Sequence, residues 1–96
     1  MYVRLVRFTF GPGKHSAAED LASKLVPAIG DQKGCNSVVF FGDASEREYG
    51  LFVMWESKED ADTATAVVGP KLQQGLAGNV QRPPDIRLCE VIEPKA

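Results

Sequence analysis

The side chains best suited to chemistry lie in residues 48–66, EYGLFVMWESKEDADTATA. Within this stretch an apolar run extends from Tyr49 to Trp55 and ends at Glu56, after which a charged, alanine-rich segment follows. Trp55 is the only tryptophan; its indole could stack on a flat aromatic ligand, or it could instead close the core at the end of a strand. Tyr49 could form a hydrogen bond with a phenolate. These two residues are therefore the first candidates for a catalytic site.

Further polar residues could complete such a site. Asn36 and Arg4 could orient a phenolate, and Arg87 could face the same pocket, although a rim position or a hydrogen bond to a loop is commoner for such residues. His15 is the only histidine and the obvious general acid or base. It precedes a predicted helix in a glycine-rich loop, where the helix dipole disfavours a protonated imidazole, so we expect it to be exposed to solvent. Asn36 is the third predicted catalytic residue.

The elements that position these residues follow from hydrophobic periodicity and from helix and strand breakers. Ser57 with Asp60 forms an N-cap pair that predicts the start of a helix, and Ser16 with Glu19 forms a similar capping box. A Gly-Pro pair at 69–70 is expected to end the second helix. The predicted elements are a strand at 2–10, a helix from 17 to about 30, strands at 35–41 and 49–55, a helix at 57–69, a helical turn at 71–77, a strand at 85–92 and a tail at 94–96.

The order strand, helix, strand, strand, helix, strand fits one domain, residues 1–96. Two right-handed crossovers around one hairpin predict an α+β, ferredoxin-like βαββαβ sandwich whose four-stranded antiparallel sheet has the order 4-1-3-2. In the third strand Tyr49, Val53 and Trp55 share one face, and Phe52 and Met54 share the other. Both faces are apolar, whereas a sheet in a small lone domain should expose one face to water. We therefore expect a homodimer.

The composition excludes several classes of function. The chain has 96 residues, of which 44% are hydrophobic and 25% charged, as in ordinary soluble domains. Its net charge is −2 and its basic residues are interspersed with acidic ones, so it lacks the basic patch typical of nucleic-acid binding. No apolar run approaches the roughly 20 residues that span a bilayer, and no secretory signal opens the chain. We expect a cytoplasmic protein without a nucleic-acid or membrane partner.

The sequence contains no motif for a metal or a tightly bound cofactor. Cys35 and Cys89 lack CxxC spacing and, with one histidine, do not make the usual four-ligand zinc set. The predicted strand order places them on opposite edges of the sheet, too far apart for a disulfide. GPGK at 11–14 lacks the GK[ST] ending of a phosphate-binding loop. From these residues we expect no tightly bound cofactor and no metal.

Three segments resemble one known family. They are GPGK at 11–14, the segment 33–35 that ends in Cys35, and FVMWESKEDADTA at 52–64, in which the Trp-Glu-Ser-Lys-Glu run is the most specific element. Over nearly its whole length the chain is similar to the antibiotic biosynthesis monooxygenase-like family. The resemblance implies a dimeric α/β barrel in which two sheets face each other, with a ligand pocket between the sheet and the helices of each subunit.

The resemblance also bears on function. Members include cofactor-independent oxygenases acting on polycyclic phenols or quinols, and haem-degrading enzymes that use a histidine on the second helix. No histidine follows His15 here, so neither that haem ligand nor the histidine that many members carry near position 64 is present. One hypothesis is a cofactor-independent monooxygenase acting on a small aromatic or polyphenolic substrate in a hydrophobic pocket. The alternative is a non-catalytic homodimer of the same fold that binds a small ligand or serves in a stress response.

The predicted site places the pocket between the third strand and the second helix. That helix presents small residues where a packing helix would usually carry leucine, which suits either a cavity or a close helix–sheet approach. The predicted catalytic residues are Trp55, Tyr49 and Asn36, and the predicted pocket residues are Arg4, Val53, Ala61, Ala64 and Arg87.

Overall fold

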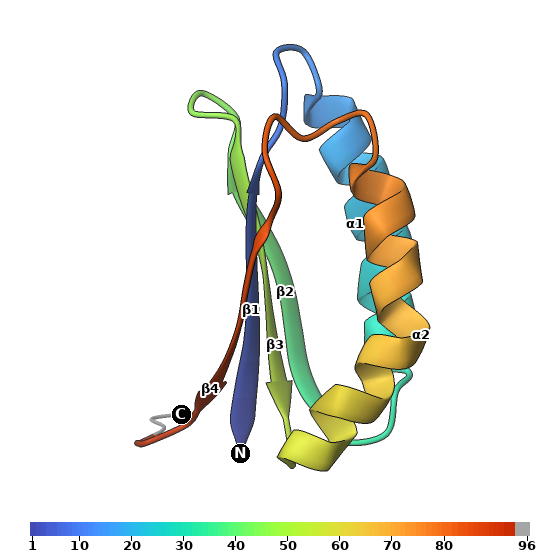
Figure 1. The fold of residues 1–96 in the computed structure, drawn as a ribbon, viewed down its shortest axis with the longest axis vertical. Helices are drawn as coiled ribbons and strands as arrows, with labels where there is room; N and C mark the ends of the chain where they lie inside the picture. The colour runs from blue at the N-terminus through green and yellow to red at the C-terminus, as the bar shows by residue number, and fades with distance from the viewer. Residues whose placement is uncertain (94–96) are drawn as a thin grey trace.

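Within residues 1–93, which the computed structural model describes, two helices cover one face of a four-stranded antiparallel sheet (Figure 1). The tail predicted at 94–96 lies outside these residues. The strand order β2-β3-β1-β4 is the predicted order read from the other edge, so the predicted α+β, ferredoxin-like sandwich is confirmed. Neither described helix is long and apolar enough to cross a membrane. The elements are β1 (Tyr2–Thr9), α1 (His15–Gly30), β2 (Cys35–Asp43), β3 (Glu48–Trp55), α2 (Lys58–Leu76) and β4 (Asp85–Glu90).

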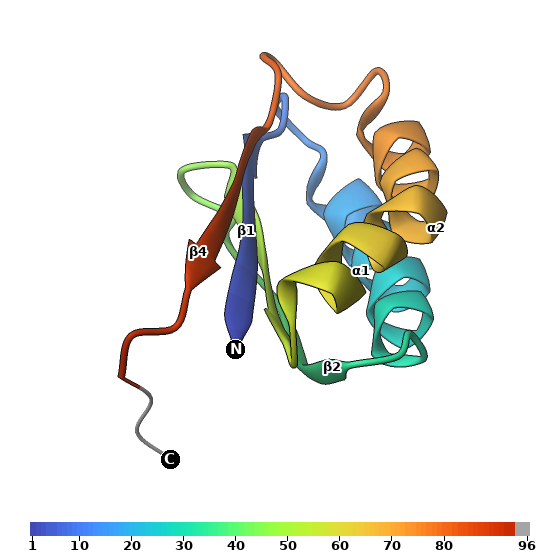
Figure 2. The same cartoon turned by 60° about the horizontal axis from the view of Figure 1, so that its bottom comes forward.

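The central strand β3 has two apolar faces with different surroundings. Its alternate residues from Tyr49 to Trp55 face the helices and are at most 5% exposed. Phe52 and Met54 lie on the opposite face and are only partly buried. Figure 2 shows both helices on the same side of the sheet, with β4 at the edge away from them. The alternation predicted for β3 is therefore confirmed, and within the described residues its outer face is left without a covering layer.

The two helices begin in different ways. Ser57 is the N-cap of α2, and its Oγ accepts a hydrogen bond from the Asp60 N–H at 3.1 Å, as the sequence predicted. Helix α1 begins at His15, and its N-cap Lys14 makes no side-chain capping bond. The predicted capping box at Ser16 is wrong because the Lys14 carbonyl already accepts the Ala18 N–H at 3.1 Å, which places Ser16 inside the first turn.

Helix α2 continues through residues 69–70, where the sequence predicted its end, and ends only at Leu76, so most of the predicted separate turn at 71–77 belongs to it. Beyond Pro70 the helix still carries core residues, since Leu72 and Leu76 are 6% and 4% exposed. Burial of these two side chains stabilises the turns after Pro70 as part of the same helix, although Pro70 has no N–H to donate to the Ala66 carbonyl. Hydrophobic packing outweighs one missing backbone hydrogen bond here.

Pro70→Ala is expected to raise the free energy of unfolding by about 2 kcal/mol, because alanine restores a backbone N–H inside an intact helix. Pro70 is exposed, so the change removes no core contact. Urea denaturation followed by circular dichroism measures the effect. Pro27→Ala, close to the end of α1, is the control and should give a smaller gain. An unchanged or lower stability of Pro70→Ala would contradict this account of α2.

The turn between β2 and β3 is shorter than the gap between the strands predicted at 35–41 and 49–55. Strand β2 extends to Asp43, and Arg47 completes the turn with a φ of 58°. The Asp43 carboxylate accepts hydrogen bonds from the Ser45 hydroxyl at 2.6 Å and from the Ser45 N–H at 3.0 Å. The Ser45 hydroxyl and the backbone N–H groups lower the pKa of Asp43. These hydrogen bonds therefore stabilise the turn fully at pH values above the usual carboxyl pKa. The stabilisation is lost as the pH falls through the lowered pKa of Asp43.

Candidate functional site

An apolar cavity of about 100 Å³ lies between the sheet and α2, beside Trp55. Ala61 and Ala64 are 1% and 3% exposed, and their short side chains leave this space where longer ones would fill it. Ile86 of β4 also lines it and is 51% exposed, which places an opening at this edge of the sheet. Besides these, the lining includes Arg4 and Val6 from β1, Leu51, Val53 and Trp55 from β3, and Thr65, Val68 and Leu72 from α2.

The indole N–H of Trp55 is buried and has no hydrogen-bond partner within residues 1–93. Trp55 is 3% exposed, and most of its neighbours around the cavity are aliphatic. Leaving a buried donor unpaired costs about 1–3 kcal/mol, and such groups are uncommon in folded proteins. An oxygen atom on a bound ligand could accept this hydrogen bond. The unpaired indole thus makes Trp55 the residue around which the candidate site is built.

Arg4 brings a positive charge to the same cavity. It lies on the helix-facing side of β1 together with Val6, because residues two apart in a strand point the same way. Its side chain is 21% exposed, and its Nη2 donates hydrogen bonds to Thr65 Oγ1 at 3.2 Å and to Asp62 Oδ1 at 3.4 Å. Both partners belong to α2, so the guanidinium joins β1 to α2 at the cavity. An anionic group on a ligand could bind there.

Three predicted site residues lie outside this cavity. Asn36 is exposed at an irregularity in β2, and its Nδ2 donates a hydrogen bond to Glu56 at 2.9 Å. Arg87 pairs in register with Leu5 on the outer face of the sheet and forms an ion pair with Asp85 at 3.2 Å. Tyr49 faces the helices, but at the opposite end of β3 from Trp55. The predicted grouping of these residues with Trp55 is therefore not found.

Tyr49 instead belongs to a cluster with His15. The Tyr49 hydroxyl lies 3.0 Å from His15 Nδ1, and His15 Nε2 lies 3.6 Å from the Glu19 carboxylate. The Tyr49 ring packs against Phe8 and Phe10. The His15 side chain is 57% exposed, as expected, but it belongs to the first turn of α1 and not to a loop. The sequence analysis did not predict this contact. The predicted topology could have indicated it, because α1 and β3 both begin at the same end of the sheet (Figure 1).

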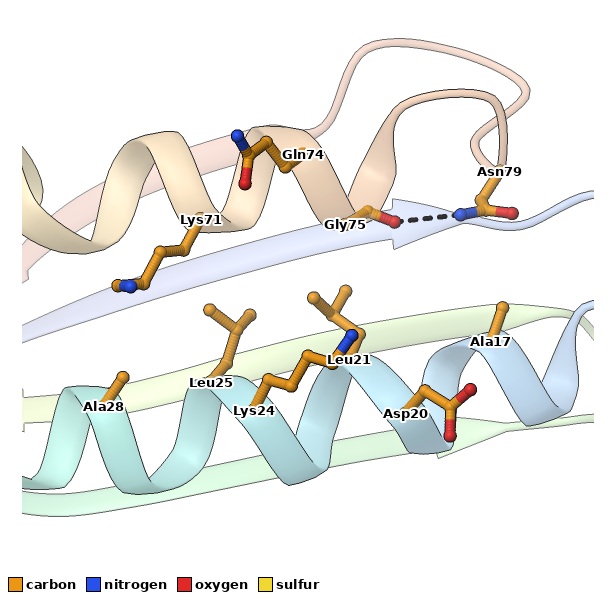
Figure 3. Close-up of a pocket in the computed structure, with 10 residues that line it drawn as sticks. All are labelled: Ala17, Asp20, Leu21, Lys24, Leu25, Ala28, Lys71, Gln74, Gly75 and Asn79. Atoms are coloured by element: carbon orange, nitrogen blue, oxygen red, sulfur yellow. Dashed lines mark hydrogen bonds between the residues drawn. The ribbon is translucent and has the colours of Figure 1, made fainter.

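A groove of about 520 Å³ lies between α1 and α2 (Figure 3). Its rim carries exposed charged side chains, including Lys24 and Lys71. The Asn79 side-chain amide that lines it already donates to the Gly75 carbonyl at 2.9 Å. In the described residues the one buried side-chain polar atom without a partner belongs to Trp55, so no such group marks this groove as a binding site. The smaller Trp55 cavity is the better candidate.

The cysteines lie apart from the Trp55 cavity. Cys35 and Cys89 are both free, and they occupy the two opposite edge strands that the predicted topology assigned to them. Burial raises the pKa of the Cys35 thiol, whose Sγ lies 3.8 Å from the Ser37 carbonyl. Among residues 1–93 no three His, Cys, Asp or Glu side chains come together as a potential metal site.

The fold and the cavity define a class of small α+β sandwich domains with an apolar pocket between the sheet and the second helix. The chain belongs to the antibiotic biosynthesis monooxygenase family, whose sequence model matches residues 1–66. No curated protein matches it by sequence. The family assignment agrees with the resemblance found in the segment around Trp55.

Solved structures share this fold at low sequence identity. A protein of unknown function from Nitrosomonas europaea has a TM-score of 0.85 at 18% identity, covering 99% of this chain and 92% of its own. Rv0793 from Mycobacterium tuberculosis has a TM-score of 0.80 at 19% identity, covering 99% and 98%. SnoaB, a cofactor-independent oxygenase from Streptomyces nogalater, has a TM-score of 0.79 at 14% identity, covering 97% and 94%. At these identities the likeness shows the fold alone.

Proposed function

We propose that this protein is a cofactor-independent monooxygenase that oxidises a small phenolic substrate in the Trp55 cavity. The observation that carries the proposal is Trp55, which lines a mostly apolar cavity and whose indole N–H is buried without a hydrogen-bond partner in the described residues. Membership of the family and the fold shared with SnoaB, a cofactor-independent oxygenase, support it. The proposal treats residues 1–96 as one catalytic domain of a cytoplasmic protein.

The proposed reaction uses a substrate that supplies its own electrons. The Arg4 guanidinium favours the ionised phenol, and the phenolic proton leaves to solvent. The phenolate gives one electron to dioxygen, and the two radicals join at a ring carbon that bears hydrogen. Loss of water from the resulting peroxide leaves one oxygen atom on the substrate and the other in water. The apolar walls limit access of competing water, and the Trp55 N–H stabilises the oxygen that carries negative charge.

Oxygen uptake with a panel of quinols and anthrones tests this function. We expect uptake above the protein-free rate with at least one compound. Tyr49→Phe tests the earlier prediction that Tyr49 is catalytic. Because its hydroxyl contacts His15 and lies outside the cavity, we expect an unchanged kcat. Uptake equal to the protein-free rate across the whole panel would rule out the enzyme.

A second candidate function is binding without turnover, in a non-catalytic homodimer of the same fold. The described lining of the Trp55 cavity contains no carboxylate, imidazole or thiol that could accept the phenolic proton, and this favours the second candidate. Calorimetry separates the two functions. Saturable binding of a quinol without oxygen uptake would support the non-catalytic protein, and binding with uptake would support the enzyme.

We further propose that a second copy of the chain covers the outer face of the sheet. Val39 and Phe41 are 48% and 44% exposed there, beside the partly buried Phe52 and Met54. An apolar surface of this kind on a small domain is typical of an interaction site. The family resemblance, which implies dimers whose sheets face each other, supports this partner.

Sedimentation equilibrium at micromolar concentration is expected to give twice the 10.4 kDa mass of one chain. Val39→Lys should shift the protein to monomers, because the dimer would bury a charge beside Phe52. The matched control is Val67→Lys on α2, where the side chain is similarly exposed at 46% but lies on the other side of the molecule. A wild-type protein that sediments only as a monomer would refute the proposed dimer.

A further inference from the structure

We propose that the first half of α2, residues 58–69, is a lid over the Trp55 cavity, which opens about a hinge at Gly69 and Pro70 and is held closed by Arg4. The inference concerns how a molecule enters the cavity, and it does not depend on the identity of the ligand or on a reaction. Four features of the molecule support it: the volume of the cavity, the anchoring of the two halves of α2, the backbone between these halves, and the contacts of Arg4.

The Trp55 cavity is too small in this structure to admit an aromatic ring. Its volume is about 100 Å³, whereas a cavity of about 150 Å³ in another protein holds benzene. Ile86 at its edge is 51% exposed, but Trp55, which lines the same hollow, is only 3% exposed. Val6 and Leu51 in the sheet wall are each 2% exposed and belong to the main core, so the sheet side resists movement. A ring can therefore enter only if the wall formed by α2 moves outward.

The two halves of α2 are anchored to the core by side chains of different size. After the hinge, Leu72 and Leu76 are 6% and 4% exposed. Before the hinge, the buried side chains are those of Ala61 and Ala64 in the lid and that of Val68 next to the hinge. Burial stabilises roughly in proportion to the apolar area removed from water, and a methyl group removes much less of it than a leucine side chain. The first turns of the lid are therefore held to the core more weakly than the end of α2.

The second half of α2 also packs closely against α1. A side chain added at Gly75 would collide with Leu21 of α1, which lies directly opposite in Figure 3. Beyond the helix, the Asn79 side-chain amide donates to the Gly75 carbonyl at 2.9 Å, and the Asn79 N–H donates to the Leu76 carbonyl at 3.0 Å. This end of α2 is therefore fixed in place, and an opening movement must involve the first half.

The backbone of α2 is weakest between the two halves. Pro70 has no N–H to donate to the Ala66 carbonyl, so one backbone hydrogen bond is missing at this point. Gly69, directly before it, has the lowest helix preference of any residue except proline. Proline and glycine are usual sites of bends in helices, and hinges are formed by a few residues whose φ and ψ can change. Bending here therefore disrupts fewer interactions than bending elsewhere in α2.

Arg4 joins the lid to the sheet. Its Nη2 donates hydrogen bonds to Thr65 Oγ1 at 3.2 Å and to Asp62 Oδ1 at 3.4 Å. The Thr65 hydroxyl donates its own hydrogen to the Ala61 carbonyl at 3.0 Å, so its oxygen is free to accept from Arg4. Among the described residues, no other side-chain hydrogen bond or ion pair connects residues 58–69 with the strands. The Asp62 side chain is 59% exposed, and exposed ion pairs contribute little stability, so these contacts are weak enough to open.

Fluorescence quenching measures the opening directly, because Trp55 is the only tryptophan of the chain. Acrylamide, a small neutral molecule, quenches an indole on close approach, so its bimolecular quenching constant rises with the fraction of time that the lid is open. The double variant Asp62→Asn with Thr65→Val should raise this constant at least about twofold, because it removes both partners of Arg4. The matched control is Thr63→Val, at an exposed position of the lid outside the cavity lining, and it should leave the constant unchanged.

Salt gives a second test of the Arg4 contacts. Raising the ionic strength from about 0.01 M to about 1 M shortens the Debye length from about 30 Å to about 3 Å and weakens an exposed ion pair. Quenching of the wild type by the neutral acrylamide should therefore increase with salt, and quenching of the double variant should not. Equal quenching constants of the wild type and the double variant at low salt would overturn the role of Arg4.

Pro70→Ala tests the hinge. It restores the backbone N–H at the point where the lid bends, so the quenching constant should fall to roughly half of the wild-type value. Pro27→Ala in α1 is the control, because it makes the same change in the other helix, and it should leave the constant unchanged. A quenching constant of Pro70→Ala equal to or above that of the wild type would overturn the hinge.

Hydrogen exchange distinguishes opening of the lid from unfolding of the whole domain. An isolated helix shorter than about 12–15 residues is marginal in water, so the backbone N–H groups of the open lid exchange with solvent. In the double variant, the N–H groups of residues 61–69 should exchange faster than in the wild type, while those of residues 72–76 keep the wild-type rate. Faster exchange over both halves of α2 would overturn the lid. These measurements use no substrate, so a failure of the lid leaves the proposed monooxygenase standing, and an absence of oxygen uptake leaves the lid standing.

Discussion

Trp55→Phe is expected to lower kcat for oxygen uptake by about 100-fold, with a change in the free energy of unfolding of less than about 1 kcal/mol. Phenylalanine retains an aromatic ring in the core but lacks the N–H. That N–H has no partner in the described residues, so the folded protein loses no internal hydrogen bond. The substrate, in contrast, loses the indole donor at the moment when negative charge develops on its oxygen.

An oxygen electrode and urea denaturation measure these two quantities on the same samples. A lower kcat at nearly constant stability would show that the indole acts on the substrate. A kcat equal to that of the wild type would mean that Trp55 only closes the core, which was the other interpretation of its sequence position.

Ala64→Leu is expected to abolish substrate binding and to raise the free energy of unfolding by about 1 kcal/mol. Ala64 is 3% exposed and lines the cavity, so the larger side chain can occupy the space of about 100 Å³ that the ring needs. The additional apolar burial stabilises the fold where a void existed. Substrate affinity should therefore fall while the free energy of unfolding rises.

Ala66→Leu, two positions along the same helix at an exposed site, is the matched control and should leave binding unchanged. Calorimetry gives the affinity, and thermal or urea denaturation gives the stability. If Ala64→Leu retained wild-type affinity, the ligand would have to bind elsewhere. A large loss of stability would show instead that the cavity cannot accept the added carbon atoms.

Much of the fold could be predicted because the strand signals are local. Alternation along β3 gave its two faces, and the hairpin and crossover rules gave the strand order. The errors arose where tertiary contacts act on a helix. Pro70 is a helix breaker by itself, but burial of Leu72 and Leu76 carries α2 past it. Sequence pattern alone cannot weigh those contacts against one lost hydrogen bond.

The candidate site was predictable where side-chain direction follows from simple periodicity. Val53 and Trp55 share a strand face, and Ala61 and Ala64 share a helix face, so all four line one cavity. Asn36 lies beside a register shift in β2, where the alternation of side chains is broken. Arg87 lies on the outer face, set by the pairing of β4 with β1. Such directions depend on pairing register, which the sequence does not specify by itself.

The central claim is that an aromatic substrate is oxygenated in the Trp55 cavity, and a rapid-quench turnover under ¹⁸O₂ with mass spectrometry of the product tests it most directly. The wild type should place one ¹⁸O atom in the product, and Ala64→Leu should form no labelled product above the protein-free level. A wild-type product without ¹⁸O, or recovery of all consumed oxygen as hydrogen peroxide, would contradict the claim.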